Sequence, residues 1–140
     1  MILESLKYAY EQGYSFSCGI KWSIRLFAIA HENGCPWDYV TCANAASNGH
    51  LECLVYVHEN KCPWNEWTCY DAASNSHLEC LVYVHKNECP WNELTCEYSA
   101  KNGHLECLKY AHENGCLWDS LTCFYAAKNK KIGLFSLCDK

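Results

Sequence analysis

His50-Leu51-Glu52-Cys53-Leu54 is the stretch of sequence that decides the fold, because it returns twice at a fixed interval. The same five residue types stand at 77–81 and at 104–108, so each copy begins 27 residues after the one before it. A Cys-x-Trp phrase and a Thr-Cys pair keep this interval, the first at 35–37, 62–64, 89–91 and 116–118 and the second at 41–42, 68–69, 95–96 and 122–123. Such a period is typical of stacked units, each of which buries its apolar face against its neighbours.

Each unit begins with the pattern of a short helix. A residue whose side chain caps helix N-termini well precedes it in every unit, at Asp38, Asn65, Asn92 and Asp119. Cysteine and alanine then recur at helical spacing on one face, as in Cys42, Ala45 and Ala46. Alanine pairs let another helix approach closely. Asn48-Gly49 predicts the turn at which this first helix ends.

A second helix is predicted directly after that turn. His50, Cys53, Leu54 and Val57 stand at i, i+3, i+4 and i+7, which indicates one buried stripe. The end of this helix differs between units. Gly115 is typical of a left-handed C-terminal residue.

Lys61 and Glu88 occupy the glycine position in two other units. There we expect the preceding residue, Asn60 or Asn87, to adopt the left-handed conformation instead, since asparagine tolerates it better than most side chains.

The repeat Thr-Cys-x-x-Ala-Ala-x-Asn-Gly-His-Leu-Glu-Cys-Leu, with its Glu-Asn-Gly-Cys-Pro-Trp-Asp ending, resembles a shortened ankyrin repeat. The resemblance covers residues 24–140, and short versions rich in cysteine and tryptophan are similar to repeats of large DNA viruses of amoebae and of some protists. It implies an all-α helical-repeat solenoid of helix-turn-helix units. The usual repeat has about 33 residues, so the projecting hairpin is expected to be shortened or absent. The Thr-Pro-Leu-His phrase of the family is missing, and with it the usual hydrogen bonds of the helix start.

These patterns predict a single ankyrin-like repeat domain over residues 1–140. Within it we distinguish a partial unit at 1–17, a shortened unit at 18–38 whose second helix begins near Ile24, full units at 39–65, 66–92 and 93–119, and a C-terminal capping unit at 120–140.

Composition excludes several classes of protein. With 140 residues, half of them apolar, the chain is long enough for one packed domain and is not disordered. A net charge of −5 and a single arginine, Arg25, disfavour nucleic-acid binding. No apolar run approaches the roughly eighteen residues of a membrane span. Thirteen cysteines without a signal-peptide pattern favour a reduced, intracellular protein. We expect it in the cytoplasm or nucleus, and in the host cell if the protein is viral. We also expect it to be a monomer.

Cysteine and histidine together suggest catalysis or metal binding, and the repeat argues against catalysis. A nucleophilic site needs one activated thiol beside one base, whereas here every such position is duplicated, so we predict no enzyme activity, no catalytic residue and no cofactor. Structural zinc binding is the more specific alternative, because His50 and Cys53 share a helical face. Cys42 of the facing helix, together with Cys35 or Cys62, could complete the four ligands of a zinc site. No Cys-x-x-Cys spacing is present. We therefore favour cysteines that fill the core, histidines hydrogen-bonded at helix starts, and no metal.

The repeated tryptophans also allow two interpretations. Trp37, Trp64, Trp91 and Trp118 form either a ladder for stacking a ligand or a set of wedges between successive units. We favour the wedges, since a buried aromatic ring supplies much of the area of a junction.

Positions that differ between units are free to recognise a partner. On the first helices, opposite the alanines, these positions mix aromatic rings with carboxylates, the composition of a recognition surface. The predicted partner-binding residues are Tyr39, Asn44, Glu66, Trp67, Tyr70, Asp71, Glu93, Glu97, Tyr98, Phe124 and Tyr125. Whether the row of Val40, Trp67, Leu94 and Leu121 extends this surface or packs between units stays open.

The expected function is that of a non-enzymatic adaptor whose concave face docks an intracellular protein, and the viral resemblance implies a host protein. A structural component that assembles with itself through its irregular first unit is a further alternative.

Overall fold

The computed structural model describes residues 28, 31, 32, 34 and 37–129, and in these ranges the chain is helical, with no strand. Seven helices of nine residues follow one another: α3 (Tyr39–Ser47), α4 (Leu51–Glu59), α5 (Glu66–Ser74), α6 (Leu78–Lys86), α7 (Glu93–Lys101), α8 (Leu105–Glu113) and α9 (Ser120–Lys128). The predicted all-α class is confirmed for this part of the chain. The shortened unit's helix near Ile24 and the end of the capping unit lie outside the described residues.

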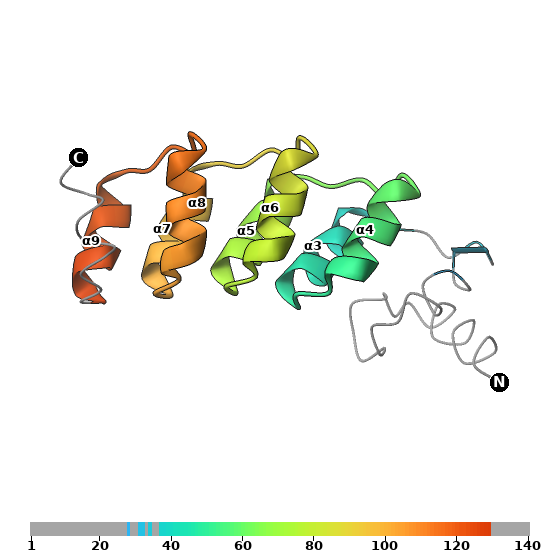
Figure 1. Cartoon of the computed structure of the whole chain (residues 1–140), viewed down its shortest axis with the longest axis horizontal. Helices are drawn as coiled ribbons and strands as arrows, with labels where there is room; N and C mark the ends of the chain where they lie inside the picture. Colours follow the sequence, from blue (N-terminus) through green and yellow to red (C-terminus); the bar gives the residue numbers. More distant parts are fainter. Residues whose placement is uncertain (1–27, 29–30, 33, 35–36, 130–140) are drawn as a thin grey trace.

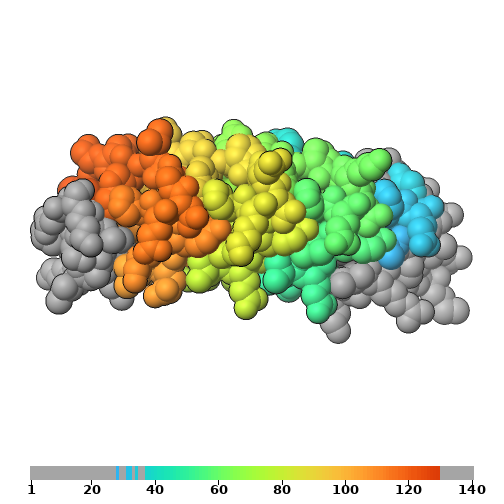
Figure 2. Space-filling view, turned by 45° about the horizontal axis from the view of Figure 1, so that its top comes forward, coloured from blue at the N-terminus to red at the C-terminus, as the bar shows by residue number. Residues whose placement is uncertain are grey.

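The helices are arranged as pairs that follow one another along an elongated molecule (Figures 1 and 2). Helices α3, α5, α7 and α9 pack side by side in chain order, and α4, α6 and α8 each pack on the odd-numbered helix before them. None of the described helices has the length and apolar character needed to cross a membrane.

The predicted N-caps of the odd-numbered helices are all present. The carboxylate of Asp38 accepts hydrogen bonds from the backbone N–H groups of Val40 and Thr41, and that of Asp119 accepts the equivalent pair. Asn65 and Asn92 each cap with one backbone hydrogen bond, to the second residue of the helix. The chain lacks the Thr-Pro-Leu-His phrase and the hydrogen bonds that this phrase forms at a helix start. The aspartate and asparagine caps supply such hydrogen bonds instead.

The turn within each pair places its central residue in the left-handed region. Gly49 and Gly103 have φ of 71° and 75°, and Ser76 takes the same conformation at 65°. Glycine is required at position 49 for two reasons. The first is its positive φ, and the second is that a Cβ there would lie 2.6 Å from Nδ1 of His77 in the next pair. The N-cap residues of the even-numbered helices are His50, His77 and His104, and none of them forms a side-chain capping hydrogen bond. These three side chains therefore do not cap their own helices.

The predicted ends of α4 and α6 need a correction. Lys61 and Glu88 themselves adopt the left-handed conformation, with φ of 68° and 66°, whereas Asn60 and Asn87 keep φ near −100°. The closing hydrogen bond decides this, because the N–H of Cys62 reaches the carbonyl of Val57, 2.9 Å away, only when the chain reverses at residue 61. The register of the repeat thus outweighs the preference of the individual side chain.

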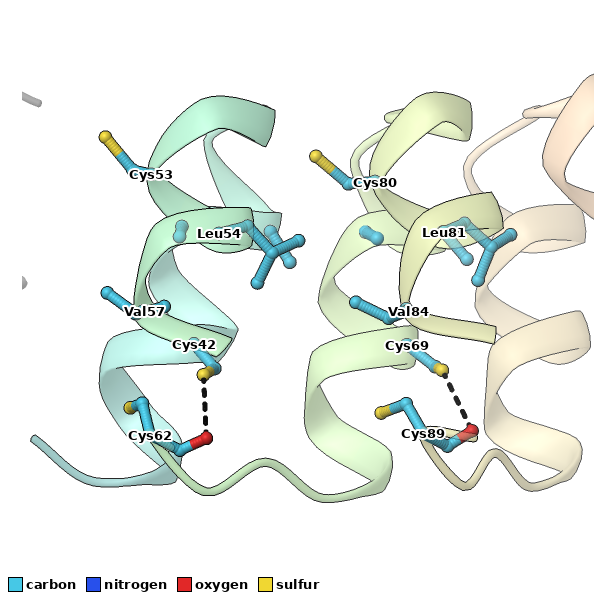
Figure 3. Packing of buried hydrophobic residues seen from close by; sticks show 14 of the residues in the cluster. Cys42, Cys53, Leu54, Val57, Cys62, Cys69, Cys80, Leu81, Val84 and Cys89 are labelled. Carbon is cyan, nitrogen blue, oxygen red and sulfur yellow. Dashed lines mark hydrogen bonds between the residues drawn. The ribbon is translucent and has the colours of Figure 1, made fainter. Parts of the chain in front are cut away.

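The core is a repeating row of small and branched apolar side chains. Leu54, Leu81 and Leu108 are fully buried in successive even-numbered helices. Figure 3 shows Leu54 facing Cys80 and Val84 of the next helix pair, so each junction is filled from both sides. On the odd-numbered helices the buried residues are alanines, cysteines, threonines and Ser99, whose small size lets these helices lie close together.

Most of the described cysteines fill the core, as predicted, and two in each of the pairs α3/α4, α5/α6 and α7/α8 also form hydrogen bonds. Nine of the described cysteines are buried free thiols, whereas Cys123 is disulfide-bonded, so the expectation of a reduced chain is wrong at this residue. The thiol of Cys62 donates to the carbonyl of Asp38 at 3.3 Å, and the thiol of Cys42 donates to the carbonyl of Cys62 at 3.9 Å (Figure 3). The same two bonds recur in the next two pairs. In each pair, a thiol after the end of the second helix is therefore hydrogen-bonded to the carbonyl of the N-cap residue of the first helix.

The tryptophans lie at the junctions between pairs, as the packing interpretation predicts. Trp64 stacks on His58 with ring centroids 3.8 Å apart and meets the edge of Tyr83 in the next pair at 6.3 Å. Trp91 repeats the arrangement with His85 and Tyr110. Each indole is half-buried by these two rings.

An asparagine ladder, which the sequence reasoning missed, connects the odd-numbered helices. Nδ2 of Asn75 donates to Oγ of Ser47, and Nδ2 of Asn102 donates to the carbonyl and hydroxyl oxygens of Ser74. The available signal was the recurrence of asparagine at 48, 75, 102 and 129. The side chain that ends one helix therefore also binds the helix before it.

Candidate partner-binding surface

The residues predicted to bind a partner lie on the odd-numbered helices or at their first turn, and they differ in exposure. Tyr39, Trp67 and Phe124 are exposed, at 46%, 44% and 57%. Glu93 is also exposed, and the half-buried members are Asn44, Glu66, Tyr70, Asp71, Glu97, Tyr98 and Tyr125. None of the eleven side chains is lost to the core.

The structure brings five of the predicted aromatic rings into two connected groups. Trp67 and Tyr70 meet edge to face with centroids 5.2 Å apart on α5, and Tyr70 meets Tyr98 of α7 at 5.0 Å in the same way. On α9, Phe124 and Tyr125 meet at 5.4 Å. Edge-to-face contacts fix ring positions before any partner arrives. We call these five residues the aromatic strip.

Lys101 bridges the two groups, and the sequence analysis did not identify it. Its Nζ lies 5.0 Å from the ring centroid of Tyr98 and 5.4 Å from that of Tyr125, within the range of a cation–π interaction. The signal in the sequence was a lysine three residues after Tyr98, because residues at i and i+3 share a helix face. The aromatic strip is thereby continuous from α5 to α9.

The open question of the Val40, Trp67, Leu94 and Leu121 row is answered by its burial. Val40 and Leu94 are half-buried, whereas Trp67 and Leu121 are exposed at 44% and 47%. The row therefore divides, and Leu121 adds an apolar side chain to the exposed surface of α9.

Asp71 is the carboxylate of this surface that lies in a partly desolvated position. Burial raises the pKa of Asp71 to about 6, and no basic group contributes to the shift. Burial also raises the pKa of Tyr70, with smaller contributions from Tyr98, Asp71 and Glu97, whereas a hydrogen bond with Ser74 lowers it. These influences place both carboxylates within electrostatic reach of the Tyr70 ring, so the surface combines aromatic rings with negative charge.

The nine buried thiols of the described residues have properties that do not suit nucleophiles. Burial raises the pKa of Cys80 and of Cys107 to about 11, and it also raises the pKa of Cys53. The hydrogen bond with Cys116 and burial raise the pKa of Cys96, while that bond lowers the pKa of Cys116. A catalytic thiol needs an accessible thiolate, whereas Cys116 is 4% exposed and donates its proton to the carbonyl of Asn92.

The hypothesis of structural zinc required several ligands to converge. Among the residues that the structure describes, no three histidine, cysteine or acidic side chains come together in a group that would hold a metal ion. His50 and Cys53 share α4 and its cap, but Cys53 faces the core.

Comparison of the chain with protein-family models found no match, and comparison with curated proteins found none either. The function is therefore inferred from the chain's own residues.

Proposed function

We propose that the chain is an ankyrin-like helical-repeat solenoid that acts as a non-enzymatic adaptor inside the cell. In this proposal a partner protein binds the face formed by α3, α5, α7 and α9, and the aromatic strip supplies its anchors. The observation that carries the proposal is the exposure of Trp67 and Phe124, at 44% and 57%, on helices whose opposite faces are already fully packed.

The aromatic composition and the preordered rings of this surface favour it as the binding face. Tryptophan and tyrosine dominate protein-binding hot spots because each buries a large area with few rotatable bonds. Ring contacts at 5.0–5.4 Å already hold Tyr70, Tyr98 and Tyr125 in place. A preordered surface loses little conformational entropy on binding, so a few anchors are enough for a specific complex.

The test is a selection of peptides from a displayed library on the immobilised full chain. The double variant Trp67→Ala/Phe124→Ala removes two exposed rings without opening the core, and we expect selected peptides to bind it at least tenfold more weakly. Leu117→Ala is the matched control, because Leu117 is 76% exposed in the loop between α8 and α9, and its effect should stay below twofold. Peptides that bind the double variant as tightly as the unchanged chain would contradict the proposal.

A further inference from the structure

Within the described residues, a lysine contacts the aromatic strip on α7 and α9, and none contacts the Trp67 and Tyr70 rings of α5. Around Tyr98 and Tyr125 the chain provides its own cation, since Nζ of Lys101 lies 5.0 Å and 5.4 Å from the two ring centroids. The rings of Tyr98 and Tyr125 therefore already form cation–π interactions with a lysine of the same chain.

The preceding helix, α5, has a serine and not a lysine at the corresponding position. Twenty-seven residues before Lys101 stands Ser74, whose hydroxyl accepts a hydrogen bond from Asn102. The neighbouring rings, Trp67 and Tyr70, meet edge to face at 5.2 Å, and the Trp67 side chain is 44% exposed. In this unit the position that corresponds to Tyr98 is Asp71, so a carboxylate stands beside the Trp67 and Tyr70 rings.

Negative charge surrounds the Tyr70 ring. Asp71 follows Tyr70 on α5, and Glu97 precedes Tyr98 on α7, and both are close enough to act on the Tyr70 hydroxyl. Asp71 is half-buried, and no cation contributes to the shift of its pKa. Two carboxylates beside two aromatic rings are complementary to a cation that can be partly desolvated.

Resting on the function proposed above, we infer that Trp67, Tyr70, Asp71 and Glu97 form a receptor for an arginine side chain of the partner protein. Arginine fits better than lysine, because its planar guanidinium stacks on rings and its fork of N–H groups pairs with carboxylates while remaining weakly hydrated. The partner is thus a protein with a basic, arginine-bearing segment. The net charge of −5 steers such a segment toward the chain from a distance.

The inference is tested with the full chain and three fluorescent peptides of equal length: nona-arginine, nona-glutamate and an uncharged Gly-Ser peptide. Anisotropy titrations at 0.15 M salt should show binding of nona-arginine, with the other two at least tenfold weaker. Equal binding of nona-glutamate or of the Gly-Ser peptide overturns the inference.

Matched variants separate the receptor from general charge attraction. Asp71→Asn/Glu97→Gln and Glu52→Gln/Glu106→Gln each remove two negative charges, the second pair from exposed positions of α4 and α8. We expect the first double variant to weaken nona-arginine binding about fivefold to tenfold and the second less than twofold. Equal losses in both would mean that the peptide senses only net charge, and the inference would fail.

The carboxyl of Asp71 gives a local readout by nuclear magnetic resonance. Saturation with nona-arginine should lower its pKa from about 6, because a cation beside it favours the carboxylate; an unchanged value places the peptide elsewhere and overturns the inference. The library selection distinguishes a failure of the arginine receptor alone from a failure of the proposed adaptor function. Uncharged selected peptides that depend on Trp67 would keep the adaptor and remove the arginine receptor, whereas peptides indifferent to Trp67 and Phe124 would remove both.

Discussion

The thiol of Cys89 donates a hydrogen bond to the carbonyl oxygen of Asn65, with 3.3 Å between Sγ and O. Asn65 caps α5, and Cys89 follows the end of α6, so this one bond holds the start of the first helix of a pair against the end of the second. Cys62 with Asp38 and Cys116 with Asn92 repeat it at the same distance. The buried sulfur is therefore a hydrogen-bond donor as well as an apolar group.

The two kinds of buried cysteine are expected to respond oppositely to serine and alanine. At Cys89 serine keeps a donor for the Asn65 carbonyl, so Cys89→Ser should be less destabilising than Cys89→Ala, which we expect to cost about 1–2 kcal/mol. Cys80 is 1% exposed and forms no side-chain hydrogen bond within the described residues, so there serine should be the worse replacement. Urea unfolding of the four variants measures this, and the same order at both positions would contradict it.

Backbone conformation predicts stabilisation at Lys61. Because its φ is 68°, Lys61→Gly should raise the free energy of unfolding by about 0.5–1 kcal/mol. In the opposite direction, Gly115→Ala should cost about 1 kcal/mol from its φ of 85° alone, since nothing lies within 4 Å of the added Cβ. Gly49→Ala should cost more, because its Cβ meets the His77 ring. Thermal melts rank the three variants, and a destabilised Lys61→Gly would be evidence against the left-handed assignment.

The asparagine caps are weaker than the aspartate caps and can be improved. Asn65 accepts one backbone hydrogen bond, and the Oγ1 of Thr68 is buried without a partner among the described residues. At Asp119 the carboxylate also reaches Oγ1 of Thr122, at 3.5 Å. Asn65→Asp should therefore stabilise the chain by about 0.5–1 kcal/mol at neutral pH, helped by the helix dipole. Calorimetry would show a higher melting temperature; an unchanged one would mean that Thr68 gains no bond.

Asp71 predicts a pH-dependent stability. Its pKa in the folded chain is about 6, against 3.8 for an ordinary aspartate, so the folded chain holds this proton more tightly than the unfolded chain. The contribution of the carboxyl to stability therefore falls as the pH rises from about 4 to about 6. Asp71→Asn should stabilise the chain above pH 6 by at most about 1 kcal/mol, since solvent screens a half-exposed group, and should change little below pH 4. Urea titrations at several pH values measure the difference, and a constant difference would show that Asp71 titrates normally.

Two tryptophans with different surroundings should differ in their contribution to folding. Trp91 stacks on His85 at 3.9 Å and contacts Tyr110, so Trp91→Ala should cost about 2–3 kcal/mol by emptying a junction. Trp67 is exposed on the aromatic strip, and Trp67→Ala should cost less than about 1 kcal/mol. Guanidinium unfolding compares them. A similar loss at both positions would mean that Trp67 is a structural residue and not an anchor.

Local interactions made much of this molecule predictable. A 27-residue recurrence, a cap residue before each first helix and an apolar stripe at i, i+3, i+4 and i+7 fix the type and order of helices α3 to α9, because each signal acts within one or two turns of chain. The same comparison of units placed Trp67, Tyr70 and Tyr98 together on one face.

Interactions between pairs were decided by the tertiary structure alone. The left-handed conformation at Lys61 follows from a closing hydrogen bond that outweighs side-chain preference, and the bond from Asn102 to Ser74 needs two helices brought side by side. The cation over Tyr98 and Tyr125 likewise depends on the distance between α7 and α9. Spacing in a sequence specifies which residues share a helix face, but the separation and rotation of neighbouring helices come from packing side chains of particular volume, and that packing determines which groups meet.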